Sequence, residues 1–170
     1  MQTPKEKRLK YLYNEIDKLW HGVTNTKNGD YPTIAKMLLE ITELNPKDVD
    51  SWENLIWLLW SMSINENDYF YLSRAQNLVK KYVSKNGNSY RAFEYAGQFY
   101  RVMYGDEKLA IYYYESAIRF KDAKITTYHS LISLFKKNND KIRAIGYCKQ
   151  CLNKFPNDPY TKSKLEELTK

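Results

Sequence analysis

The chain is poor in the residues that interrupt regular secondary structure, with 6 glycines and 5 prolines among 170 residues. Turn-rich architectures draw heavily on these two residues, so their scarcity argues against one. Aromatic residues are abundant instead: 16 Tyr, 4 Trp and 6 Phe make up 15% of the chain. Few chain breakers and many large rings together favour an all-α protein whose helices pack through aromatic side chains.

Long apolar segments are also missing. The longest apolar run, from Leu55 to Trp60, is far shorter than the ~20 residues that a membrane-spanning helix needs. Residues 1–10 are charged, and no apolar segment of the kind found in secretory leaders follows them. We therefore expect a cytoplasmic protein that does not enter a membrane.

Signatures of catalysis are lacking as well. The sequence has no glycine-rich phosphate loop and no HExxH motif. Ser130 follows His129 directly, but adjacent residues of a helix point apart and cannot act as a catalytic pair. We therefore expect no enzymatic activity, no catalytic residues and no cofactor.

The net charge of +7 is unevenly distributed along the chain. Residues 1–120 hold 16 basic and 15 acidic residues, a net of +1, whereas residues 121–170 hold 11 and 5, a net of +6. The simpler interpretation is a soluble surface rich in lysine. The alternative is an acidic partner, either a protein segment or a nucleic acid.

Helical periodicity extends over most of the sequence. Apolar residues recur at helical spacing, and Asp, Ser, Gly and Pro stand where helices begin or end. The resulting prediction is a series of helices with two long connections, at 21–30 and 62–69. The predicted helices cover residues 5–20, 31–44, 50–62, 69–84, 89–103, 107–120, 124–137, 141–154 and 159–168.

Two stretches of the chain repeat each other at a spacing of 34 residues. Gly105-Asp106 corresponds to Asn139-Asp140, and Ala110 corresponds to Ala144. The correspondence continues with Tyr114 and Cys148, Ala117 and Cys151, and Asp122 and Pro156. A fixed period of this length indicates one supersecondary unit that is copied along a helical solenoid.

The repeated stretch resembles the tetratricopeptide repeat. Residues 125–158 carry its pattern best, with Tyr128, Leu131 and Phe135 in the first helix. The repeat that begins at Tyr90 has one extra residue before its turn. The resemblance implies a single domain over 1–170, a right-handed superhelical solenoid of about four antiparallel helix pairs. It divides the chain into repeats at about 5–48, 49–89, 90–124 and 125–158, with a cap at 159–170.

Cys148 and Cys151 have the CxxC spacing of some redox and metal sites. A redox pair is expected in a βαβ context, which the helical pattern does not provide. A zinc site needs further ligands, and the two histidines, His21 and His129, belong to no close ligand cluster in the sequence. Both cysteines fall on core-facing repeat positions, so we interpret them as core residues, with a labile disulfide or metal as the alternative.

In the family that the chain resembles, the first helix of each pair lines a concave groove that binds partners. The resemblance therefore implies a protein-interaction or scaffold module that takes a partner peptide or protein segment, with an acidic segment as one alternative. The groove residues that it assigns here are Asn54, Trp57, Trp60, Arg91, Tyr95, Gln98, Arg101, His129 and Lys136.

Trp57 and Trp60 are the most informative of these residues. Trp52, Leu55, Ile56 and Leu59 already complete the apolar stripe of their helix, and both tryptophans lie off it. One interpretation is packing against the long first helix or its loop. The other is an aromatic anchor for a partner segment.

Three alternatives remain open at this stage. A carboxylate clamp known from relatives would use Lys10, Asn14, Asn54 and Arg91, but its fifth position is Tyr95, which is not basic. A protein associated with RNA or DNA would use the basic C-terminal third, where tyrosines stack on bases and lysines contact phosphates. A self-assembling scaffold would associate through its aromatic surface.

Overall fold

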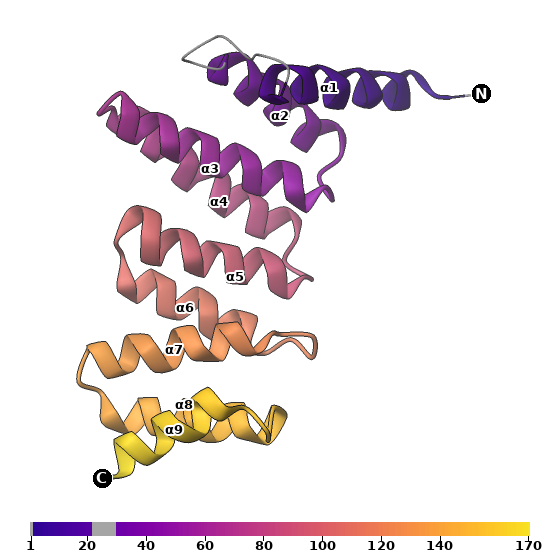
Figure 1. Cartoon of the computed structure of the whole chain (residues 1–170). Coiled ribbons are helices and arrows are strands. Elements are labelled where there is room, and N and C mark those ends of the chain that lie inside the picture. Colours follow the sequence, from indigo (N-terminus) through magenta and orange to yellow (C-terminus); the bar gives the residue numbers. More distant parts are fainter. Residues whose placement is uncertain (1, 22–29) are drawn as a thin grey trace. The chain divides into compact units, whose positions relative to one another are not determined.

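The computed structural model describes residues 2–21 and 30–170 (Figure 1), so most of the connection predicted at 21–30 lies outside the described residues. Over those two ranges the chain forms nine α-helices, one π-helix and no strand, which confirms the all-α fold. None of the described helices is long and apolar enough to cross a membrane.

The helices form two compact units, an N-terminal unit of residues 1–86 and a C-terminal unit of residues 87–170. Their boundary falls in the turn between the second and third predicted repeats. That the whole chain is one domain stays a prediction. The N-terminal unit contains α1 (Pro4–His21), α2 (Tyr31–Leu44), α3 (Val49–Asn65) and α4 (Tyr69–Lys85). The C-terminal unit contains α5 (Tyr90–Gln98), η1 (Phe99–Tyr104), α6 (Glu107–Ala117), α7 (Ile125–Lys137), α8 (Lys141–Lys154) and α9 (Pro159–Thr169).

Within each unit, consecutive helices pack as the pairs that the repeat predicts. α3 packs on α4, α5 and η1 pack on α6, and α7 packs on α8 (Figure 1). We call the first helix of each pair an A-helix and the second a B-helix. α1 and α3 are thus the A-helices of the N-terminal unit, and α5 with η1, and α7, are those of the C-terminal unit.

Two predicted helix ends differ from the structure by three residues, and the other described ends lie within one residue of the prediction. α3 continues three residues beyond the predicted end at Met62 and so shortens the expected connection. α6 ends at Ala117, not at Phe120, because the backbone tightens there: the amide of Phe120 donates to the carbonyl of Ala117, three residues back. Such bonds close a helix end with a narrower turn.

The turn from A-helix to B-helix has the same construction in each pair that the structure describes in full. A left-handed residue comes first, which explains the Gly or Asn at this position. An aspartate follows and accepts a hydrogen bond from a backbone amide of the next helix, which caps that helix. The left-handed residues are Asn67, Gly105 and Asn139, and the capping residues are Asp68, Asp106 and Asp140.

Small residues lie where the two helices of a pair approach each other. Ala75, Ala110 and Ala144 each stand in the first half of a B-helix and are completely buried. Gly97 in α5 is the most crowded of the described glycines, since a Cβ atom built there would lie 2.6 Å from the ring of Tyr114. Close packing of this kind has no room for an added methyl group.

The extra residue predicted before the third turn is accommodated by η1. A π-helix takes up one additional residue per turn, and here the amide of Gly105 bonds to the carbonyl of Tyr100. Large rings fill the wider turn: Tyr100 stacks on Tyr113 with ring centroids 5.3 Å apart. The one-residue insertion therefore leaves the following αL turn and its aspartate cap intact.

We expect Gly97→Ala to destabilise the chain, although alanine favours a helix. Overpacking against the buried ring of Tyr114 costs about 1–3 kcal/mol, which exceeds the helical gain of up to about 1 kcal/mol. Gly146 in α8 is the matched control, because a Cβ atom there would have no neighbour within 4 Å. Gly146→Ala should raise the free energy of unfolding in urea. Equal effects of the two substitutions would contradict the packing argument.

Candidate functional site

The A-helices of the N-terminal unit carry two stacked, exposed tryptophans. Trp20 of α1 and Trp57 of α3 have ring centroids 6.4 Å apart and an interplanar angle of 29°. Their exposed fractions are 38% and 43%, which is high for rings of this size. Trp57 therefore packs against the first helix, as one interpretation expected, and still presents a large apolar surface to solvent.

A cleft lies beside this pair. Tyr13, Ile16, Asp17, Trp20, Leu38 and Asn54 line it, and its volume is about 380 Å³. A second hollow of about 530 Å³ shares several of these residues and extends to the start of α3, where Asp48, Asp50 and Ser51 line it. The floor is apolar and the end near α3 is acidic.

A hydrogen bond between Tyr13 and Asp48 joins α1 to the start of α3, where the second hollow lies. The Tyr13 hydroxyl donates to Asp48 Oδ2 at 2.5 Å, and Asp48 also caps α3 by accepting from the amide of Ser51. Burial, followed by the hydrogen bond to Asp48, raises the pKa of Tyr13 to about 12. The hydroxyl therefore stays protonated and keeps donating over the whole physiological pH range.

The predicted site residues of α3 occupy different surroundings. Asn54 is exposed and lines both the cleft and the second hollow. Trp57 stacks on Trp20, which lines the cleft. Trp60 is half-buried and lines neither hollow. The structure thus brings Asn54 and Trp57 to one surface, to which Trp20 and Tyr13 add side chains that the sequence analysis did not single out.

In the C-terminal unit, hydrogen bonds join α5 and η1 to α7. Arg101 Nη2 donates to Ser133 Oγ at 3.4 Å, and Thr127 Oγ1 donates to Glu94 Oε1 at 2.6 Å. Gln98 is exposed, whereas Arg91 and Tyr95 are half-buried. Some polar side chains around the predicted site residues of α5 and η1 are therefore already hydrogen-bonded to α7.

The two predicted site residues of α7 are both engaged by the cap helix. His129 Nε2 lies 2.8 Å from Asp158 Oδ2, and the His129 ring packs on Tyr160 with centroids 4.4 Å apart. Lys136 forms a salt bridge with Glu167. Sequence reasoning treated α9 only as a cap and did not anticipate that it would contact these side chains.

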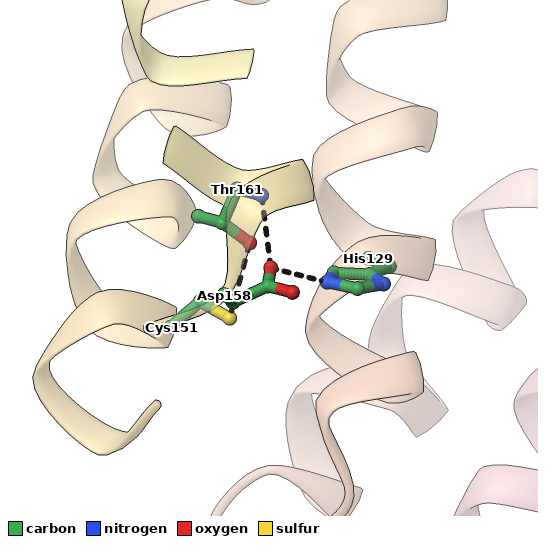
Figure 2. A network of polar contacts seen from close by, with 4 residues as sticks. All are labelled: His129, Cys151, Asp158 and Thr161. Carbon is green, nitrogen blue, oxygen red and sulfur yellow. Dashed lines mark hydrogen bonds and ion pairs between the residues drawn. The ribbon is translucent and has the colours of Figure 1, made fainter. Parts of the chain in front are cut away.

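Three potential metal ligands meet at this point. Atoms of His129, Cys151 and Asp158 all lie within 4.8 Å of one another (Figure 2). The sequence-based interpretation that His129 belongs to no close ligand cluster is therefore wrong. Asp158 is 29 residues from His129 in sequence, and only the packing of α7, α8 and the start of α9 brings them together.

Cys148 and Cys151 are both free and completely buried, which confirms their assignment to the core. Burial raises the pKa of the Cys148 thiol to about 11 and shifts the pKa of Cys151 in the same direction. Of the two, only Cys151 belongs to the cluster with His129. The CxxC spacing therefore places Cys151 in a polar network and Cys148 in the buried core outside that cluster.

A further cleft lies on α2, α3 and α4 of the N-terminal unit. Its volume is about 390 Å³, and its lining includes Leu39, Leu59 and Leu78 together with Lys36 and Arg74. No sequence signal marked it, because its residues come from three helices and occupy ordinary amphipathic positions.

Comparisons with known proteins place the fold. No family model matches the chain. No curated protein matches its sequence. One crystal structure of MamA, a protein of tetratricopeptide-like repeats, aligns with a TM-score of 0.65 at 15% identity over 95% of this chain and 81% of that one. A second MamA crystal structure aligns with a TM-score of 0.59 at 14% identity, covering 99% and 84%. At these identities the likeness concerns the helical-repeat fold alone.

Glu167 provides a test of how α9 is held. Its carboxylate lies between Lys136 and Lys164, whose hydrogen bonds lower its pKa from the ordinary 4.5 to about 2. Because the folded-state pKa is depressed, this contribution to stability is present above about pH 4.5 and is lost as the pH falls toward 2. An NMR titration should show the low midpoint in the native chain and a higher one in Lys136→Met. Lys137→Met is the control, because Lys137 bonds Glu107, and an equal shift there would contradict the assignment.

Proposed function

We propose that the chain is a tetratricopeptide-type interaction module that binds a segment of a partner protein. The segment would bind on the exposed face of α1 and α3 in the N-terminal unit, which we call the A-helix surface. The all-α helical-repeat fold and its likeness to MamA support this class of function. The role proposed is that of a scaffold, without catalysis of its own.

The observation that carries the proposal is the exposed Trp20–Trp57 pair. Large aromatic side chains dominate binding energetics when a partner covers them, because they bury much apolar area at little cost in conformational entropy. Each ring already packs on the other, so the pair is held in place before a partner arrives. Pre-ordering of this kind lowers the entropic cost of binding.

The adjoining cleft suggests what the partner segment offers. Ile16 and Leu38 provide an apolar floor suited to one large hydrophobic side chain. The exposed Asn54 amide both donates and accepts hydrogen bonds, which matches the backbone of an extended segment. Acidic groups line the end near α3, so an apolar or basic segment suits this cleft better than the acidic one that the net charge suggested.

The nucleic-acid alternative has less support. Several basic side chains of residues 121–170 are already engaged with carboxylates: Lys136, Lys137, Arg143 and Lys164 each form a salt bridge. A phosphate-binding surface depends on cations that are available to replace counterions. The uneven charge of the sequence is therefore partly used for contacts within the C-terminal unit.

We expect Trp57→Ala and Trp20→Ala to weaken binding of the native partner by about 30-fold each. Loss of a central aromatic anchor costs about 2 kcal/mol or more, and about 1.4 kcal/mol corresponds to a tenfold change in Kd. Trp60→Ala should have a smaller effect, because Trp60 is half-buried and, unlike Trp57, does not belong to the exposed stacked pair. Affinity purification followed by titration of the recovered partner measures all three.

Tyr69→Ala is the matched control for this experiment. Tyr69 is the most exposed aromatic residue of the N-terminal unit, at 81%, and it lies at the start of the B-helix α4. A loss of binding in Tyr69→Ala equal to that in Trp57→Ala would refute a specific role for the A-helix surface. Binding that persists in both tryptophan variants and falls steeply with salt would favour the nucleic-acid alternative.

A further inference from the structure

We propose that His129, Cys151 and Asp158 form a binding site for a divalent transition-metal ion of the zinc class. The three side chains come from different elements: His129 from α7, Cys151 from α8, and Asp158 from the residue that caps α9 (Figure 2). Imidazole, thiolate and carboxylate are the three ligand types that zinc sites in proteins use.

The spacing of the ligand atoms is close to what such an ion requires. Bonds of about 2.0–2.3 Å in a tetrahedral arrangement place ligand atoms roughly 3.3–3.8 Å apart. Here all three ligand atoms lie within 4.8 Å of one another, and His129 Nε2 and Asp158 Oδ2 are 2.8 Å apart. To match this arrangement, the close nitrogen–oxygen pair must open slightly and the longest separation must close by about 1 Å.

Thr161 holds two of the ligands in position. Its hydroxyl donates to Cys151 Sγ at 3.3 Å, and its backbone amide donates to Asp158 Oδ2 at 2.8 Å. Hydrogen bonds from the protein to metal ligands are a regular feature of metal sites, because they fix ligand orientation and stabilise a thiolate. Burial alone would raise the pKa of Asp158, but the hydrogen bonds from Thr161 and His129 outweigh it and keep the carboxylate ionised.

Binding requires a defined exchange of protons. The Cys151 thiol releases its proton to solvent and bonds the metal as a thiolate. His129 binds through Nε2 in the tautomer that carries its proton on Nδ1, so the hydrogen bond to Asp158 is replaced by two bonds to the ion. With three protein ligands, water occupies the fourth position of a tetrahedral ion. No electron transfer is involved.

The consequence for the fold is local to the C-terminal unit. The ion would join α7, α8 and the first turn of α9 at a single point, next to the contact between His129 and Tyr160. Because the ion binds the folded chain and not the unfolded one, it would stabilise the docked position of α9.

Cobalt titration of the chain, freed of metal by a chelator, tests the proposal directly. The expected result is one Co²⁺ per chain, with the visible bands of four-coordinate cobalt, a thiolate-to-cobalt charge-transfer band, and displacement of both by Zn²⁺. Asp158→Asn, which keeps a good helix cap, should lose most of the affinity. Thr161→Val should weaken binding by about 10–100-fold.

The two cysteines provide the matched control. Cys148 and Cys151 are equally buried and lie three residues apart on α8, but only Cys151 is in the cluster. Cys151→Ser should abolish the charge-transfer band, and Cys148→Ser should leave it unchanged. Circular dichroism of the metal-free variants confirms that each is folded. Weak binding without a thiolate band, or equal spectra of the two serine variants, would overturn the proposal and leave a polar network only.

Discussion

The close approach of the two helices in each pair is the constraint on which the rest of the structure depends. Alanine or glycine at the contact lets the helix backbones come together, and the rings of residues such as Tyr114 and Tyr100 fill the space that remains. In the pairs that the structure describes in full, a left-handed residue and an aspartate cap follow the A-helix and start the B-helix at a fixed point. With this geometry, the outward face of an A-helix does not have to pack in the core of its pair and can carry binding residues.

The repeat also accounts for how neighbouring pairs meet. Hydrogen bonds between equivalent helices join residues that are about one repeat apart in sequence, such as Tyr13 with Asp48, Arg101 with Ser133, and Glu115 with Tyr147. A solenoid built in this way presents the same surface positions again and again. The functions proposed above therefore depend on the side chains at those positions. They are the exposed tryptophan pair in the N-terminal unit and the cluster that the cap helix completes in the C-terminal unit.

Much of the fold could be predicted from the sequence because its signals are local. Helix spacing, the Asp caps and the residues before the turns are set within a few positions, and even the extra residue of η1 was visible as an offset in the repeat. The candidate site was harder to predict from the sequence. The stacking of Trp20 on Trp57, the contact of His129 with Asp158 and the cleft beside Leu38 depend on packing between helices that lie far apart in sequence. Periodicity assigns a residue to a face, but it does not say which neighbour meets it there.

The central claim is that a partner segment occupies the A-helix cleft of the N-terminal unit, and a photo-crosslink tests it most directly. A photoreactive residue in place of Asn54, which is exposed and lines that cleft, should capture a partner segment in the native cell. The account predicts that this crosslink disappears when Trp57 is also replaced by alanine, while a photoreactive residue at Tyr69 captures no such segment. Capture at position 54 that persists in Trp57→Ala, or equal capture at position 69, would contradict it.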